Sequence, residues 1–172
     1  ESIVAGIQKL EPGHRLRLES GKDPVVERYW ELRFLPDAQR SEEDTIEELR
    51  AQLQESVRYH LVSDVPVGAF LSGGIDSSSV VASMAMMATG RVKTFSIGFR
   101  EQEFNELPYA RLIAERFGTD HHELVLEPDV LDPLDHFAWD LDEPFGDASA
   151  IPTYMVSRLA SQQVKVVLSG DG

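Results

Sequence analysis

Apolar and polar residues follow two different periods along this chain. Within residues 1–36 they alternate in short stretches such as 14–18, around a turn at 20–24, which predicts a β-hairpin. Further on they recur at helical spacing, which predicts a helix that begins after Ser41 and buries one face. The apolar positions of that helix are Ile46, Leu49, Leu53, Val57 and Leu61.

Beyond Val65, apolar runs of strand length alternate with helical stretches. The predicted strands are the run that starts at Val65 and residues 92–97, 122–126 and 164–168. The predicted helices follow Gly74 or cover 105–117, 130–139 and 151–163. This alternation predicts an α/β fold with a twisted parallel sheet. Ligands bind beyond the carboxyl ends of such strands, so we expect one cleft where these loops meet: 72–78, 97–106, 140–150 and 169–172.

The change of pattern predicts two domains. Residues 1–36 form the first and residues 37–172 the second. The chain begins at Glu1 and ends in a loop directly after a predicted strand, where an α/β domain ordinarily continues into a covering helix. We therefore expect a piece of a longer protein, with sequence missing on both sides.

Composition narrows the class of function. Hydrophobic residues make up 42% of the chain and charged residues 27%, which is typical of a globular protein. The net charge of −14 argues against a nucleic-acid partner, because such surfaces need clustered Lys and Arg. The chain has no cysteine, which excludes disulfides and thiol catalysis and agrees with a cytoplasmic location. No apolar run approaches the length of a membrane span.

The loop of residues 72–78, Ser-Gly-Gly-Ile-Asp-Ser-Ser, stands between the first strand of the predicted sheet and a helix. Gly73 and Gly74 let backbone N–H groups approach an anion, and the helix aims its unpaired N–H groups at the same point. The hydroxyl donors of the loop are Ser72, Ser77 and Ser78. The loop contains neither G-x-x-x-x-G-K-S/T nor G-x-G-x-x-G, so it predicts another kind of phosphate site. A serine-capped turn without a ligand is the alternative.

This loop resembles the pyrophosphate loop of ATP-pyrophosphatases, which cleave ATP between its α and β phosphates to form an adenylate. Four further motifs are SDVPVG at 63–68, FSIGF at 95–99, GTDHHE at 118–123 and VLSGDG at 167–172. With them, the chain resembles the synthetase domain of glutamine-dependent asparagine synthetases. Residues 6–14 and 28–32 resemble the end of that family's N-terminal glutaminase domain. The resemblance implies a sheet of the adenine-nucleotide α-hydrolase, or ATP-pyrophosphatase, type.

The resemblance also implies an ATP site, with pyrophosphate in the loop and adenine between neighbouring strands. Its residues would be Leu71, Ser72, Gly73, Gly74, Asp76, Ser77, Ser78, Ile97, Ser169 and Gly170. Leu71 and Ile97 would line the adenine and ribose region, and Ser169 with Gly170 would complete the nucleotide contacts. Taken alone, Leu71 and Ile97 are equally well explained by core packing.

Carboxylates add a metal site and a catalytic candidate. Mg²⁺ prefers few carboxylates together with substrate phosphates, so we expect Asp76 to bind it, with Glu143 or Asp147 as a second ligand. A solvated acidic loop is the alternative for the last two. Asp171 matches a position that is catalytic in the family and often Glu there, near the substrate carboxyl. Its shorter side chain leaves that role open.

His121-His122-Glu123 suggests a metal site at first sight. Adjacent residues on a strand point to opposite faces of the sheet, so the two imidazoles cannot readily share one ion. We therefore expect ordinary strand positions, one buried and one exposed.

The resemblance implies an ATP-dependent amide ligase that adenylates the side-chain carboxylate of aspartate and then uses ammonia from glutamine to form asparagine. The glutaminase part and a C-terminal helical part would lie outside this chain, which would be inactive alone. The sequence leaves the oligomeric state open, a homodimer included. Three alternatives remain: a related ligase with another acyl substrate (β-lactam-forming or peptide-modifying), a nucleotide-binding module without turnover, and an interaction domain that binds no ATP.

Overall fold

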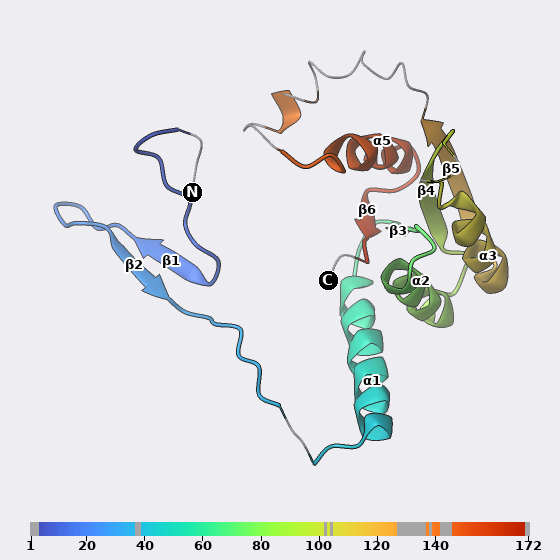
Figure 1. The fold of residues 1–172 in the computed structure, drawn as a ribbon, viewed down its shortest axis with the longest axis horizontal. Coiled ribbons are helices and arrows are strands. Elements are labelled where there is room, and N and C mark those ends of the chain that lie inside the picture. The colour runs from blue at the N-terminus through green and yellow to red at the C-terminus, as the bar shows by residue number, and fades with distance from the viewer. Residues whose placement is uncertain are drawn as a thin grey trace. The chain divides into compact units, whose positions relative to one another are not determined.

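A computed structural model describes residues 4–36, 39–101, 103, 105–126, 137, 139–141 and 146–170 (Figure 1). The chain divides into two units, Glu1–Ser41 and Glu42–Gly172. In the first unit, β1 (His14–Arg17) pairs antiparallel with β2 (Val25–Arg28). The hairpin that the alternating pattern predicts is therefore present.

Helix α1 (Glu42–His60) opens the second unit directly after Ser41. Acidic residues occupy its first turn, where they complement the helix dipole. Val57 is buried, but Ile46 and Leu49 are exposed. The predicted buried face is thus real only in the second half of the helix, because the core to which α1 contributes extends only to its last turns.

The sheet consists of four parallel strands in the order β5-β4-β3-β6. Its strands are β3 (Val67–Phe70), β4 (Lys93–Phe99), β5 (Asp120–Leu126) and β6 (Val166–Leu168). The helices between them are α2 (Ile75–Met87), α3 (Leu107–Phe117) and α5 (Ala150–Ser161). This arrangement confirms the predicted α/β class. The helix expected at 130–139 lies largely outside the described residues.

Element boundaries differ from the predictions by a few residues. β5 starts at Asp120 rather than at 122, because that residue already pairs with Lys93 in the parallel register. α3 starts at Leu107 rather than Asn105, and the Asn105 side-chain oxygen accepts a hydrogen bond from the Leu107 N–H at 3.3 Å. Gly118 ends α3 in the left-handed conformation, as expected of a glycine at that position.

Helices cover both faces of the sheet. The core on one face combines residues of α1, α2 and α3 with the sheet: Val57, Ala69, Leu71, Val81, Met84, Val92, Ala110 and Ala114. On the other face Phe95 packs with Val156 and Ala160 of α5 and with Val164. Side chains alternate between these faces along each strand, so the edge where the strands end lies between two packed layers. None of the described helices is both long and apolar enough to cross a bilayer.

Met84 and Met86 of α2 offer a matched test of this packing. Met84 is 1% exposed and Met86 is 63% exposed. We predict that Met84→Ala lowers the free energy of unfolding by about 2–5 kcal/mol, because it leaves a cavity. Met86→Ala is expected to change it by less than about 0.5 kcal/mol. Urea denaturation of both variants, followed by circular dichroism, checks this, and equal losses would contradict the assigned core.

Candidate functional site

A cavity of about 410 Å³ lies where β3 and β6 end, beside β4. Small-molecule sites commonly measure about 300–1,000 Å³. Most of the residues expected to bind nucleotide lie on its wall: Leu71, Ser72, Gly74, Asp76, Ser77, Ile97, Ser169 and Gly170. Gly73 and Ser78 are not part of the wall. The structure therefore brings residues of all four predicted loops together around one space.

Hydrogen bonds between Ser72 and Ser77 shape the loop. Their hydroxyl oxygens are 2.9 Å apart, and the Ser72 N–H donates to the Ser77 hydroxyl at 3.2 Å. The Gly74 N–H donates back to the Ser72 hydroxyl at 3.2 Å. The two serines thus tie the loop to the first turn of α2.

The first turn of α2 keeps unpaired backbone donors. Gly74 caps the helix without a side-chain hydrogen bond. The N–H of Ser78 bonds to the Gly74 carbonyl, but no described residue accepts from the N–H groups of residues 75–77. Because residues at this turn line the cavity, the N-terminal end of the helix dipole is available to an anion there.

Two glycines allow neighbouring elements to approach this turn. Gly73 has φ of +85°, and a Cβ there would lie 2.5 Å from the Tyr109 Cβ of α3. A Cβ on Gly170 would lie 2.3 Å from the backbone nitrogen of Ser77. Gly73 therefore serves the loop's contact with α3, and Gly170 the contact between the end of β6 and α2.

Of the four carboxylates expected at the site, the structure describes Asp76 and Asp147, and only Asp76 lines the cavity. Asp76 is exposed and lines the cavity. Asp147 is not on the cavity wall; its carboxylate accepts a hydrogen bond from the Ser149 N–H at 2.8 Å, which lowers its pKa. Glu143 and Asp171 lie outside the described residues. Within the described ranges, no group of three or more metal-ligating side chains is found.

Ser78 behaves differently from the other loop serines. Its hydroxyl oxygen is buried and has no hydrogen-bond partner among the described residues. Ser78 does not line the cavity. Its expected contact with nucleotide stays a prediction.

Several wall residues were missed by the sequence analysis. Glu106 at the start of α3 and Ser96 of β4 line the cavity, as do Ser149 and Thr153 at the start of α5. The Ser96 hydroxyl also donates to the Leu71 carbonyl, at the entry to the loop. Glu106 and Ser149 lie in two of the loops that were expected to converge on the cleft, so the sequence could have identified them as candidates. Ser96 lies in the FSIGF motif at 95–99, whereas no local signal marks Thr153.

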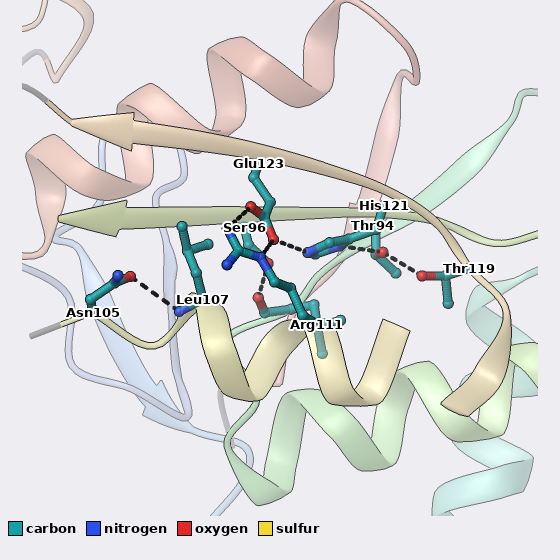
Figure 2. Close-up of polar contacts among 9 residues, drawn as sticks. Thr94, Ser96, Asn105, Leu107, Arg111, Thr119, His121 and Glu123 are labelled. Atoms are coloured by element: carbon teal, nitrogen blue, oxygen red, sulfur yellow. Dashed lines mark hydrogen bonds and ion pairs between the residues drawn. The ribbon is translucent and has the colours of Figure 1, made fainter. Parts of the chain in front are cut away.

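His121 and His122 occupy opposite faces of β5, as expected of adjacent strand residues, but both are half-buried, so the expectation that one of them is exposed is wrong. Figure 2 shows His121 in a row of polar contacts that starts at Arg111 of α3 and ends at Thr119. His122 instead stacks on Phe95, with ring centroids 5.4 Å apart. The two imidazoles therefore do not share an ion.

The protonation states of the row follow from its geometry. Burial lowers the pKa of His121, and Glu123, 3.2 Å away, only partly opposes this effect. Hydrogen bonds from Arg111 lower the pKa of Glu123. The pKa values of His121 and Glu123 thus both lie below their ordinary ones.

Comparison with known proteins agrees with this geometry. The sequence pattern of one family, described as asparagine synthase, matches residues 48–172. The chain belongs to the asparagine synthase family. This membership confirms the resemblance found in the motifs and, together with the parallel sheet, the fold class that the resemblance implied.

Relatives in the asparagine synthase family align along nearly the whole chain. Asparagine synthetase 1 (glutamine-hydrolyzing) of Bacillus subtilis is 38% identical over 99% of this chain and 27% of the relative. A putative asparagine synthetase 2 (glutamine-hydrolyzing) of Methanocaldococcus jannaschii is 43% identical over 99% of this chain and 33% of the relative. The chain therefore spans a third or less of the length of these relatives.

Two further similarities are more distant. Amidase chyE of Penicillium rubens is 30% identical over 99% of this chain and 28% of the relative. Among solved structures, an NH3-dependent NAD synthetase from Campylobacter jejuni aligns over 76% of this chain and 56% of that chain, at 18% identity and a TM-score of 0.47. That structural likeness is too low to bear on function.

The lowered pKa of His121 predicts how stability depends on pH. Above the ordinary histidine pKa of 6.5 the folded and unfolded states are both neutral here, and the contribution of the site is fully present. As pH falls from 6.5 through the lower folded pKa, the unfolded state binds the proton first and this contribution is lost. We predict that His121→Asn reduces the fall in unfolding free energy between pH 7 and 5.

Urea denaturation at several pH values measures this effect, with His60→Asn as a control on the exposed end of α1. An unchanged slope in His121→Asn would contradict the burial assigned to this imidazole.

Proposed function

We propose that this chain supplies the ATP-binding part of a glutamine-dependent asparagine synthetase. A carboxylate oxygen of the aspartate side chain attacks the α-phosphorus of ATP, the bond to the β-phosphate oxygen breaks, and pyrophosphate leaves. Ammonia released from glutamine then attacks the acyl carbon of the aspartyl adenylate, and AMP leaves as asparagine forms. Family membership over residues 48–172 supports this assignment.

The observation that carries the proposal is the set of unpaired N–H groups at residues 75–77. Negative charge grows on pyrophosphate as it leaves, and donors already fixed around it stabilise the transition state more than the ground state. The hydroxyls of Ser72 and Ser77 lie beside these amides. These hydroxyls bond to each other and to the Gly74 backbone, so they hold the loop in shape and leave the backbone amides as the proposed phosphate donors.

The rest of the cavity suits the nucleoside. Leu71 is 1% exposed and belongs to the core, and Ile97 packs with the core on the opposite face of the sheet. Both also line the cavity. They therefore serve packing and present an apolar wall to adenine at the same time. Ser169 and Gly170 lie on the same wall and are assigned to the remaining contacts with the nucleotide.

Mg²⁺ fits this site through Asp76. Its exposed carboxylate stands at the cavity next to the proposed phosphate donors, and Mg²⁺ needs few protein ligands when phosphate oxygens and water complete its shell. The bound ion would neutralise charge on the phosphates. Glu143 or Asp147 remains the proposed second ligand.

Asp171 remains the proposed catalytic carboxylate near the substrate. It follows directly after Ser169 and Gly170, which line the cavity. The two residues that precede Asp171 are therefore part of the cavity wall, which supports this proposal.

A ligase with another acyl substrate is the second candidate. Amidase chyE also aligns over nearly the whole chain, so similarity over these residues does not identify the acyl substrate. The test is to supply the full-length protein with ATP, Mg²⁺, glutamine and a panel of carboxylic acids. Aspartate-dependent pyrophosphate release together with asparagine formation supports the proposal. Release with another acid but not with aspartate would transfer the assignment to the second candidate.

A nucleotide-binding module without turnover is a separate possibility for the 172-residue chain itself. Titration of ATP–Mg²⁺ into this chain, with a parallel assay for asparagine, addresses it. Binding without product assigns the chain as a module, whereas asparagine formation would show that the missing parts are dispensable. An interaction domain would bind no ATP.

Asp76→Ala tests the proposed metal contact. We predict that it weakens ATP–Mg²⁺ binding at least tenfold, about 1.4 kcal/mol, because the phosphates lose their bridge to the protein. Isothermal titration calorimetry measures the change. Asp64→Ala is the matched control, since Asp64 is also exposed but precedes β3 rather than following it. Equal effects of the two substitutions would contradict the assignment.

A further inference from the structure

Helix α3 forms a wall behind the phosphate loop. A Cβ on Gly73 would lie 2.5 Å from the Tyr109 Cβ and 2.6 Å from the Ala110 nitrogen, so the loop backbone rests directly on this helix. Ala110 is fully buried, and Glu106 at the start of the helix lines the cavity. The position of the first turns of α3 therefore sets where the loop can lie.

An ion pair one residue beyond this contact holds α3 to the sheet. The Arg111 Nε donates to the Glu123 Oε1 at 2.8 Å, and its Nη2 donates to the Oε2 at 2.6 Å. Figure 2 shows Arg111 reaching from α3 toward β5. A two-point contact of this kind restricts orientation as well as distance.

Behind the carboxylate of Glu123, the Nε2 of His121 makes a close polar contact that is not a hydrogen bond. This contact measures 3.2 Å, and the Nδ1 of His121 is 2.8 Å from the Thr94 hydroxyl. That hydroxyl is in turn 2.8 Å from the hydroxyl of Thr119. Thr94 and Thr119 are buried, so the row is anchored inside the sheet (Figure 2).

The same face of the sheet also holds the entry of the loop. Ser96 is the register partner of Glu123 in the pairing of β4 with β5, and its hydroxyl donates to the Leu71 carbonyl. Leu71 directly precedes Ser72. Ser96 and Glu123 are thus paired on neighbouring strands. Ser96 holds the start of the phosphate loop, and Glu123 holds α3, on which that loop rests.

We propose that the Arg111–Glu123 pair is a positioning element of the ATP site: it holds α3 at the distance at which the phosphate loop presents its N–H groups. This inference rests on the proposed function. Arg111 touches neither the cavity nor the loop, and its side chain is 55% exposed, so the pair contributes little to overall stability. Small displacements of binding groups nevertheless cost much affinity.

The test uses the full-length protein with Arg111→Met, Glu123→Gln and Arg111→Lys. We expect Arg111→Met and Glu123→Gln to weaken ATP–Mg²⁺ binding about fivefold or more and to raise KM for ATP while KM for aspartate stays unchanged. Arg111→Lys restores part of the affinity, because it keeps the charge but loses the two-point contact. Glu123→Gln keeps the side-chain shape and serves if Arg111→Met fails to fold.

Lys93→Met is the matched control. Lys93 and Asp120 form another ion pair between β4 and β5, at 2.8 Å, but at the amino ends of these strands, away from the cavity. We expect it to leave ATP binding within twofold of the wild type. A loss as large as that of Arg111→Met would overturn the proposal, and so would unchanged binding in both Arg111→Met and Glu123→Gln.

Hydrogen exchange in the absence of nucleotide separates this inference from the proposed function. We expect Arg111→Met and Glu123→Gln to accelerate amide exchange at Ser72, Gly74 and Ser78, whose N–H groups are hydrogen-bonded in this loop, and Lys93→Met to leave it unchanged. A wild-type protein that binds no ATP would refute the proposed function, while the exchange rates would still decide whether the pair positions the loop. Unchanged exchange in both variants would overturn the positioning role.

Discussion

The cavity at the carboxyl ends of the strands depends on one constraint, the unpaired N–H groups at the start of α2. A helix cannot satisfy its first amides internally, and here no described side chain accepts from residues 75–77. Ile75 and Asp76 are exposed and Ser77 is buried, and their N–H groups precede that of Ser78, which bonds to the Gly74 carbonyl. An anion competes well with water at this point, because several donors and the helix dipole act on it together. The fold keeps this turn accessible at the edge of its sheet.

The elements around α2 keep that turn in place. α3 supports the loop at Gly73, and the end of β6 reaches the first turn at Gly170. The hydroxyls of Ser72 and Ser77 bond to each other and to the loop backbone, leaving the helix amides unoccupied. The sheet thus brings four separate chain segments to one cavity, and the polar row from Arg111 to Thr119 fixes one of them, α3, from outside.

Local patterns predicted what depends on neighbours in sequence. The loop of residues 72–78, the hairpin, the left-handed Gly118 and the alternation of strands and helices were all predictable, since each follows from a short stretch of residues. The opposite orientations of His121 and His122 followed from strand geometry in the same way. The family was also identifiable from the sequence, because each of its motifs is a short contiguous stretch.

Features that depend on distant partners were not predictable. The pairing of Arg111 with Glu123 and the contact of Ser96 with Leu71 require the register of β4 against its neighbours, which no single segment carries. The same is true of the strand order and of the exposed first half of α1. The roles of Glu143 and Asp171, the domain boundary at 36–37 and the cytoplasmic location stay predictions.

A crystal structure of the full-length protein with a non-hydrolysable ATP analogue and Mg²⁺ tests the central claim most directly. It should place the β- and γ-phosphate oxygens about 2.7–3.2 Å from backbone nitrogens of residues 75–77, with the metal at Asp76. Nucleotide bound elsewhere, with these amides paired to the protein, would contradict the account.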